Sequence, residues 1–297
     1  MSNTIAIERL KSDGMIPEDS LVLSEHNNTV IMSETEQLVA RIALQSAMLE
    51  RDDPGDLIYS HKLSWNLNAA AGVLAPLAPE PLIHEETVIS AYPLMQPVRW
   101  GHTSAEQIYR TVESFNSAST AGFQLRRMDI AEYAQNRIDQ VVAQSVESRL
   151  EVDWVRDVLG KYCGSYPFHQ LTTDSPGLVH GDLHTGNVVV DLEDNPLLID
   201  LDSAAIGPVQ YDIASWHVRS AQGDTAPTGA MLDIYKQSPE WNDESFRALM
   251  GWKVISSMTH ALRYEKETNL PERINQLFRI ATYIGAAGNW KDSHVTA

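Results

Sequence analysis

The N-terminal part of the chain alternates short apolar runs with polar turns, which is the pattern of β-strands joined by short connections. Residues 21–24 and 29–32 flank one such turn, and a third apolar run covers residues 37–43. Two more extended segments are predicted at residues 82–83 and 87–90. Short consecutive strands with tight turns pair antiparallel. The pattern therefore predicts a small antiparallel sheet near the N-terminus.

Helical spacing replaces strand spacing further along the chain. A helix predicted over residues 57–71 ends at Gly72, because glycine is favoured just past a helix C-terminus. Apolar residues then recur at the spacing of one helix face, at Ala105, Ile108, Tyr109, Val112 and Phe115. More helices are predicted over residues 130–145, 152–162, 245–264 and 271–286. The chain is thus expected to be an α+β protein with a small mixed lobe, residues 1–94, and a larger mainly helical lobe, residues 95–297.

Composition and charge narrow the class of protein. The 297 residues are 43% hydrophobic and 21% charged, as in globular proteins. The single cysteine, Cys163, excludes an intrachain disulfide and a cysteine-built zinc site. No signal peptide or membrane-spanning run is visible, so a cytoplasmic protein without a membrane partner is expected. The net charge of −18 argues against nucleic-acid binding and would favour a cationic ligand, although an acidic surface can also serve solubility alone.

The candidate chemistry is concentrated in one short segment. His180, Asp182, Asn187 and Asp200 lie within 21 residues of one another. Two apolar runs on either side of the turn-rich residues 191–196 predict a hairpin. A symmetric hairpin would place Asn187 opposite Asp200, at a spacing that one Mg²⁺ could bridge. The segment therefore predicts a metal site made of an amide and a carboxylate.

Asp182 lies in a glycine-containing loop five residues before Asn187, so its carboxylate could point at the same centre. There it could orient an incoming hydroxyl or accept its proton, while Mg²⁺ neutralises phosphate charge. Asp, Asn and Gly are also ordinary turn residues, so each of them alone has a purely structural interpretation. The pattern as a whole favours phosphoryl transfer.

The sequence HGDLHTGN, residues 180–187, resembles the HGDxxxxN motif of the aminoglycoside phosphotransferase and choline kinase-like families. IDLD, residues 199–202, is similar to their metal-binding segment. Gly207-Pro208 and YDIA, residues 211–214, resemble their downstream element. The resemblance implies a bilobal protein-kinase-like fold. It also implies transfer of phosphate from ATP, or GTP, to a small hydroxylated compound.

The resemblance assigns roles to the residues of these motifs. Asp182 would be the catalytic carboxylate, and Asn187 and Asp200 would hold Mg²⁺. His180 and Asp212 would support the catalytic loop. Asp212 also fits an N-cap of the helix that follows it.

The resemblance places the nucleotide in the N-lobe. Asn27 and Asn28 would form the nucleotide loop, and Arg41 would bind phosphates from the third strand. Ala91 and Tyr92 would lie in the hinge strand and hold adenine through backbone groups. The alternative for Arg41 is an edge-strand arginine that reaches for water.

One feature of the family is missing from the N-lobe. Its first helix usually carries a glutamate that pairs with the basic residue, whereas this sequence has Ser60, His61 and Lys62 there. Glu50 or Asp56, from an adjacent turn, could substitute for it.

The expected acceptor is an amine-bearing compound such as an aminoglycoside or amino sugar, which would make the chain an antibiotic-resistance enzyme. Candidate acceptor contacts are Asp202, His184 and Trp216, with an acidic cluster at Glu240, Asp243 and Glu244. Two alternatives stay open: a housekeeping kinase of a neutral sugar or amino-acid metabolite, and a nucleotide-binding protein of kinase fold without turnover.

Overall fold

The computed structural model divides the chain into two compact units. It describes residues 3–25, 29–44, 54–85, 87–97, 103–120, 122–144, 150–171, 176–221, 228–239, 241–264 and 269–283. The first unit comprises Met1–Leu125 and Gly186–Ala204, and the second comprises Arg126–Thr185 and Ala205–Ala297. This division follows the internal packing of the chain. The lobe boundary between residues 94 and 95 stays a prediction.

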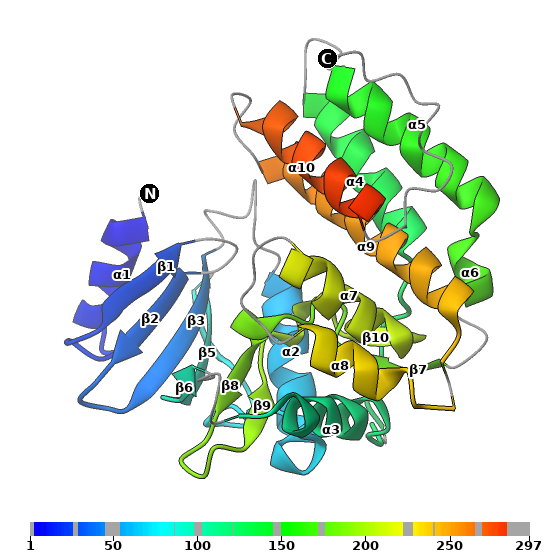
Figure 1. Cartoon of the computed structure of the whole chain (residues 1–297). Coiled ribbons are helices and arrows are strands. Elements are labelled where there is room, and N and C mark those ends of the chain that lie inside the picture. The colour runs from blue at the N-terminus through cyan, green and yellow to red at the C-terminus, as the bar shows by residue number, and fades with distance from the viewer. Residues whose placement is uncertain are drawn as a thin grey trace. The chain divides into compact units, whose positions relative to one another are not determined.

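The first unit is built on a five-stranded antiparallel sheet in the order β1-β2-β3-β5-β4 (Figure 1). Its strands are β1 (Leu21–Glu25), β2 (Thr29–Ser33), β3 (Leu38–Leu44), β4 (Leu82–His84) and β5 (Thr87–Pro93). They confirm the strands predicted from the alternating pattern. The expected α+β class, with an antiparallel sheet near the N-terminus and a mostly helical remainder, is therefore correct.

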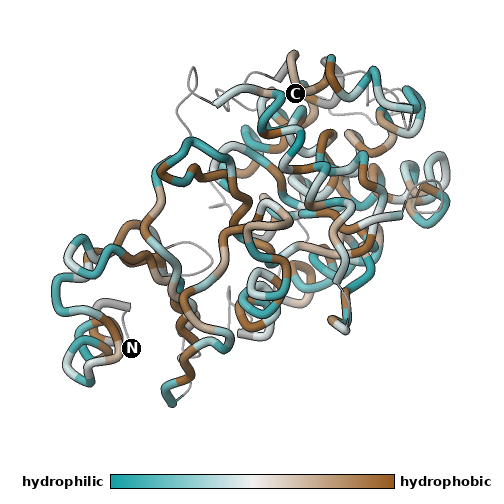
Figure 2. Tube along the Cα trace, turned by 90° about the horizontal axis from the view of Figure 1, so that it is seen from below, coloured by the Kyte–Doolittle hydropathy of each residue, from teal (hydrophilic) through white to brown (hydrophobic). Residues whose placement is uncertain are grey.

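Side chains along β3 point alternately to the two faces of the sheet, and each face packs against its own apolar cluster. Ala40 and Ile42 join a cluster that includes Ile7 and Leu10 of α1 (Asn3–Ser12), a helix the sequence pattern did not predict. Ala43 joins the opposite cluster with residues of α2 (Pro54–Leu67) and β5. Brown, hydrophobic stretches accordingly recur along the traced strands and helices in Figure 2. The face that carries Ala43 also carries Arg41, since side chains two residues apart point the same way.

The predicted helix over residues 57–71 is interrupted near its end. α2 stops at Leu67, and Asn68, whose φ is +48°, caps the short 3₁₀ helix η2 (Ala69–Ala71) by accepting a hydrogen bond from the Ala70 N–H. Gly72 then has the left-handed conformation that the sequence predicted for it, with φ of 69°. A Cβ at Gly72 would also overlap the Thr111 side chain, so packing adds to the backbone requirement for glycine.

A second, three-stranded sheet in the order β6-β8-β9 completes the first unit. Its remaining elements are β6 (Gln96–Pro97), α3 (Ala105–Asn116), η3 (Thr185–Asn187, at the border of the two units), β8 (Val188–Val190), β9 (Pro196–Leu198) and η4 (Leu201–Ser203). α3 packs against β9 and η2, and α2 packs against η4. The helix α2 is thereby in contact with both the five-stranded sheet and the segment that follows the predicted hairpin.

The second unit is mainly helical. Its elements are α4 (Ile130–Gln144), α5 (Leu150–Ser165), α6 (Phe168–Leu171), β7 (Pro176–Val179), β10 (Ala205–Pro208), α7 (Gln210–Ala221), α8 (Thr228–Tyr235), α9 (Asp243–Tyr264) and α10 (Leu270–Tyr283). α4, α5, α9 and α10 pack together, and α7 packs on α9 (Figure 1). β7 and β10 pair antiparallel and bracket the HGDLHTGN and IDLD motifs in the sequence. Within the described residues, no helix is both long enough and apolar enough to cross a membrane.

Candidate active site

The β8–β9 hairpin forms, but with a register that differs from the prediction by one residue. Val188 pairs with Leu198, and the Ile199 N–H donates to the Asn187 carbonyl at 3.0 Å, so Asn187 lies opposite Ile199 and not Asp200. The reason is the connecting loop of five residues, 191–195. The Asp191 carboxylate accepts the N–H groups of residues 193 and 195, both at 2.9 Å, and fixes this loop.

Asp200 leaves the strand immediately after this pairing ends. Its backbone is left-handed, with φ of 64° and ψ of 62°, and it caps the N-terminus of η4. A left-handed aspartate costs conformational energy, and such strain gathers where a side chain must be aimed. Asn187 is buried in the same hairpin.

The oxygens of Asn187 and Asp200 are of the type that Mg²⁺ accepts. Mg²⁺ usually takes one or two protein carboxylates together with substrate phosphates and water. No group of three His, Cys, Asp or Glu side chains suited to a metal occurs among the described residues. An amide and a carboxylate therefore fit a magnesium ion that arrives with a nucleotide.

Arg41 forms a fork with the segment after the hairpin. Its Nη1 and Nη2 donate to the two carboxylate oxygens of Asp202 at 3.1 and 2.6 Å, and Nη2 lies 3.2 Å from Asp200 Oδ1. Such paired bonds are the strongest geometry available to arginine and carboxylate. Burial alone would lower the pKa of Arg41, but the Asp200 and Asp202 carboxylates raise it well above its usual value. Arg41 is therefore a permanently charged group held beside a predicted metal ligand.

Asp202 was predicted to contact the acceptor, but here its carboxylate holds Arg41. Burial raises the pKa of Asp202, and the charge and hydrogen bonds of Arg41 outweigh that effect, so the net pKa is lowered. Of the α2 residues at the position of the missing glutamate, Ser60 and His61 are buried, and His61 bonds Ser90 Oγ at 2.7 Å. The carboxylate that pairs with Arg41 is thus that of Asp202, which lies in η4.

The predicted hinge residues lie on β5. Ala91 pairs with β3, and its carbonyl accepts the Leu77 N–H at 2.8 Å, so this oxygen is already used. The Tyr92 ring packs in an apolar cluster with Leu74 and Leu197. Partly buried Met95, Val189 and Ile199 extend the same cluster. Tyr92 is therefore part of the apolar core at the end of β5. The predicted loop residues Asn27 and Asn28 lie outside the described residues.

In the second unit, Asp212 fixes the loop that carries Asp182. Asp212 lies inside the first turn of α7 and not at its N-cap, as α7 begins at Gln210. Its fully buried carboxylate accepts the N–H groups of His180, at 2.8 Å, and Gly181, at 3.0 Å. Gly181 has φ of 82°, a conformation that favours glycine. The turn that precedes Asp182 is therefore held from α7.

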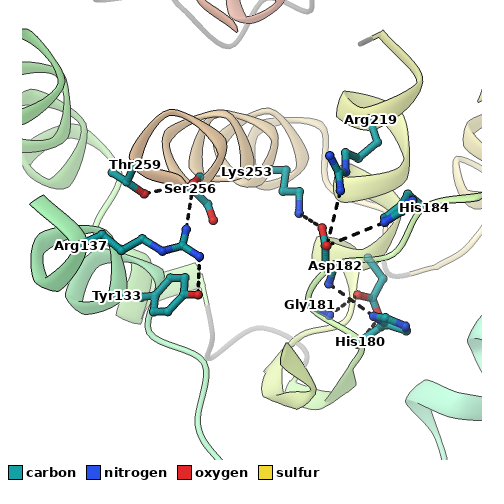
Figure 3. Close-up of polar contacts among 11 residues, drawn as sticks. Tyr133, Arg137, His180, Gly181, Asp182, His184, Arg219, Lys253, Ser256 and Thr259 are labelled. Carbon is teal, nitrogen blue, oxygen red and sulfur yellow. Dashed lines mark hydrogen bonds and ion pairs between the residues drawn. The ribbon is translucent and has the colours of Figure 1, made fainter. Parts of the chain in front are cut away.

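Basic side chains surround the Asp182 carboxylate (Figure 3). Lys253 Nζ of α9 donates to Oδ1 at 2.6 Å, and Arg219 Nη2 of α7 lies 3.6 Å from Oδ2. His184 Nε2 lies 3.8 Å from the same Oδ2. Burial would raise the pKa of Asp182, but Lys253, followed by Arg219 and His184, lowers it far below its usual value. Asp182 is ionised at any physiological pH.

The same charges act on the neighbouring bases. Burial, together with Arg219 and Lys253, lowers the pKa of His184 to about 4, against the opposing effect of Asp182. Burial also lowers the pKa of Lys253, while Asp182 raises it. His184 is therefore neutral at pH 7, and it can donate or accept one hydrogen bond at each ring nitrogen but carries no charge.

Sequence reasoning did not find Lys253 or Arg219, because neither belongs to a motif. One signal was present for Lys253: it is a lone cation within the apolar run Trp252 to Ile255 of a helix, where a charge needs a buried partner. Arg219 follows Trp216 by one helical turn.

Trp216 itself is buried, so the structure does not expose its side chain for the predicted contact with the acceptor. Of the acidic cluster, Asp243 pairs with Arg247 on an exposed helix surface, and Glu240 lies outside the described residues.

Comparisons with known proteins agree with this geometry. Residues 103–249 match the model of a phosphotransferase enzyme family, APH. A comparison with curated protein sequences finds no match. Among solved structures, the aminoglycoside phosphotransferase APH(4)-Ia is 14% identical, with a TM-score of 0.66 over 95% of this chain and 99% of that one.

Two other solved structures show the same similarity. The amicoumacin kinase hAmiN, in complex with AMP-PNP, Ca²⁺ and Ami, is 14% identical, with a TM-score of 0.67 over 97% of this chain and 94% of that one. The choline kinase LicA from Streptococcus pneumoniae is 13% identical, with a TM-score of 0.65 over 94% and 98% of the two chains. These matches confirm the fold predicted from the sequence. The family match confirms the resemblance carried by the HGDLHTGN and IDLD motifs.

Proposed function

We propose that this chain, whose residues 103–249 match the phosphotransferase enzyme family, is a small-molecule kinase that transfers the γ-phosphoryl group of ATP, or GTP, to a hydroxyl of a small compound. The observation that carries this proposal is the Asp182 carboxylate, kept ionised by Lys253 and Arg219 on a loop tied to Asp212. Phosphoryl transfer depends mostly on positioning and on neutralising charge, and this arrangement serves both.

Asp182 would bind the acceptor hydroxyl and orient its oxygen for attack. Its low pKa makes it a poor store for a proton, so it would act by accepting a hydrogen bond while the proton leaves to the transferred phosphate or to water. Asn187 and Asp200 would hold Mg²⁺, which supplies charge neutralisation at the phosphates. Arg41, aligned by Asp202, would bind the α- and β-phosphates.

For the acceptor, the sequence predicts an amine-bearing compound such as an aminoglycoside or amino sugar. The net charge of −18 supports attraction of cations over long distances, and the structural neighbours include kinases named for cationic antibiotics or choline. A role in antibiotic resistance rests on this prediction alone. A cytoplasmic location follows from the need for cellular ATP and is likewise part of the proposal.

Two other functions were compatible with the sequence. A kinase of a neutral sugar or amino-acid metabolite uses the same residues, and only the acceptor differs. A nucleotide-binding protein without turnover was suggested by the missing glutamate of the N-lobe helix. The fork between Arg41 and Asp202 supplies the counter-ion that this glutamate would provide, which favours an enzyme with turnover.

Thermal unfolding of the purified protein tests the nucleotide half of the proposal. ATP should raise the Tm only in the presence of Mg²⁺, and Asp200→Asn should abolish the effect of Mg²⁺. Asp243→Asn, on an exposed ion pair, is the matched control and should behave as the native protein. An absent response to MgATP, or an unchanged response in Asp200→Asn, would refute the assignment of the metal site.

The reaction is tested by mass spectrometry of mixtures that contain MgATP and a panel of aminoglycosides, amino sugars, choline analogues and neutral sugars. A phosphorylated product that disappears with Asp182→Asn is the expected result. Slow hydrolysis of ATP that persists in Asp182→Asn would show that the carboxylate is not the catalytic group.

A further inference from the structure

The groups in contact with Asp182 carry a net positive charge. Within the described residues, one carboxylate faces two cations, Lys253 and Arg219. The buried Asp212 carboxylate, which accepts the backbone N–H groups of the loop, keeps its own negative charge and offsets one of these cations. Arg137 of α4 adds a third cation that lowers the pKa of Lys253 and of His260. The acceptor hydroxyl must approach this basic cluster to reach Asp182.

Arg219 has the properties of a ligand-binding cation. Its side chain is 33% exposed, and the adjoining Asp182 side chain is 37% exposed, whereas that of Lys253 is only 6% exposed. Its contact with Asp182, at 3.6 Å, is an ion pair longer than a hydrogen bond, and its buried Nε has no hydrogen-bond partner among the described residues. A guanidinium group has five N–H donors in a planar fork that fits an oxyanion. The Nη donors of this partly exposed side chain are available for a ligand, whereas the buried Nε is not.

Coulomb energies favour an anion at this position. Like charges in contact repel each other strongly even at the effective dielectric constant of a protein surface, and opposite charges attract by the same amount. An ammonium group beside Arg219 would meet that repulsion. Of the carboxylates predicted to contact the acceptor, Asp243 pairs with Arg247 and Asp202 holds Arg41. The overall charge of −18 acts through solvent, where salt screens it beyond about 8 Å. Local charge therefore decides specificity.

We infer that the acceptor is an anionic hydroxy compound, in which a carboxylate or phosphate group lies one to three carbons from the hydroxyl that is phosphorylated, and that Arg219 binds this anionic group. The inference rests on the proposed kinase function and specifies its substrate class. In the reaction, the bond between the γ-phosphorus and the β,γ-bridging oxygen of ATP breaks, a bond forms between that phosphorus and the acceptor oxygen, ADP leaves, and the hydroxyl proton passes to phosphate or water.

Matched sets of acceptors test the inference with the full chain and MgATP. One set is glucosamine, glucose and glucuronate, and another is choline, glycerol, glycerate and glycerol phosphate. Product formation by mass spectrometry should favour the anionic members at least tenfold in kcat/KM, and glycerate against glycerol phosphate distinguishes the two kinds of anion. Preference for the amine-bearing members would restore the acceptor predicted from the sequence, which this inference replaces, and preference for the neutral members would overturn the inference as well; both outcomes leave the kinase function intact.

Variants of Arg219 test whether this residue causes the preference for anionic acceptors. Arg219→Gln should raise the KM for the anionic acceptor at least tenfold and leave the KM for ATP within twofold, and Arg219→Lys should recover part of the loss. Arg156→Gln, in the exposed ion pair with Asp153 on α5, is the matched control. A raised KM for ATP with an unchanged KM for the acceptor would assign Arg219 to the transferred phosphoryl group and refute its role with the acceptor.

If no compound of either set is phosphorylated, ligand binding is measured in place of product formation. Thermal shifts with MgAMP-PNP and each compound are then compared between the native protein and Arg219→Gln. Stabilisation by the acids that is lost in the variant supports the inference, and no stabilisation by any acid overturns it. Failure of the kinase function itself is recognised separately, because MgATP alone would then give no shift.

Discussion

Lys253 and Asp182 are 71 residues apart in the sequence and form a 2.6 Å charge-assisted hydrogen bond inside the second unit. The Lys253 side chain is almost fully buried, so its charge depends on this one carboxylate. Asp182→Asn should therefore lower the free energy of unfolding by about 3 kcal/mol, because it leaves an uncompensated buried ammonium group. Urea denaturation measures the loss.

The double variant Asp182→Asn/Lys253→Met provides the control for that prediction. It removes both charges and should recover most of the stability without any kinase activity. Asp243→Asn, which breaks an exposed pair, should cost less than about 1 kcal/mol. If Asp182→Asn were as stable as the native protein, the ion pair would contribute nothing to the fold.

The fork between Arg41 and Asp202 should control nucleotide binding. Asp202→Asn leaves Arg41 with Asp200 only, so Arg41 should be drawn toward the predicted metal ligand and away from the phosphates. We expect the KM for ATP to rise about tenfold, a change of about 1.4 kcal/mol. Steady-state ATP hydrolysis at several Mg²⁺ concentrations measures it, and higher Mg²⁺ should partly restore the native value.

A double-mutant cycle separates this positioning role from simple damage to the fold. Arg41→Met and Asp202→Asn together should cost no more than Arg41→Met alone, since Asp202 acts through Arg41. Glu80→Gln, which breaks the exposed pair with Lys62, should leave the KM for ATP unchanged. Additive effects of the two substitutions at Arg41 and Asp202 would contradict the role.

His184 should make the protein less stable in mild acid. Its pKa is about 4 in the folded chain and 6.5 in the unfolded chain, because burial, Arg219 and Lys253 disfavour its charged form. Between these values only the unfolded chain binds the proton, so stability is complete above pH 6.5 and falls as the pH drops toward 4. At pH 5 the loss reaches about 2 kcal/mol.

His184→Gln removes that titration and should flatten the stability profile between pH 7 and pH 5 by the same amount. Urea denaturation of both proteins at pH 7, 6 and 5 measures the difference, and the remaining histidines cancel because both proteins contain them. Parallel profiles would show that His184 has an ordinary pKa in the folded protein.

Much of the fold could be predicted from periodicity. Strands β1, β2, β3 and β5 and helices α3, α4, α5 and α9 lie within a few residues of their predicted ranges, because apolar residues recur along them at strand or helix spacing. α1 was not predicted, and its pattern is weak because Ile7 and Leu10 pack on the sheet whereas Ile5 is exposed. The pairing of β7 with β10 was not predicted either, because 25 residues separate Val179 from its partner Ala205 and no local pattern relates them.

The candidate site was predictable only where a motif carried it. Asp182, Asn187, Asp200 and Asp212 stood out in the sequence, whereas Lys253 reaches the site from a helix with no motif. The one-residue error in the hairpin register came from the loop fixed by Asp191, which closes over five residues, 191–195, and not over the six residues 191–196 that were predicted. Long-range ion pairs and turn chemistry are the two features that local periodicity does not encode.

Gly251 of α9 should be intolerant of any side chain. A Cβ at this position would overlap the hydroxyl and ring of Tyr162, which donates to the Ala248 carbonyl at 2.8 Å within the helix packing. Gly251→Ala should therefore lower the free energy of unfolding by about 2 kcal/mol or more. Gly160→Ala, on the exposed side of α5 with open space around it, should instead add up to about 1 kcal/mol. Equal effects of the two substitutions in urea denaturation would contradict the packing argument.

The first unit is assembled from two separate stretches of sequence, since residues 186–204 return β8, β9 and η4 to it after the chain has entered the second unit. No single cut can therefore release either unit whole, and a fragment that ends at residue 125 would lack both predicted metal ligands. The same interleaving defines how parts could be exchanged between relatives. A chimera that takes residues 126–185 and 205–297 from another kinase, and keeps the remainder of this chain, would replace the acceptor-binding machinery while preserving the residues assigned to the nucleotide.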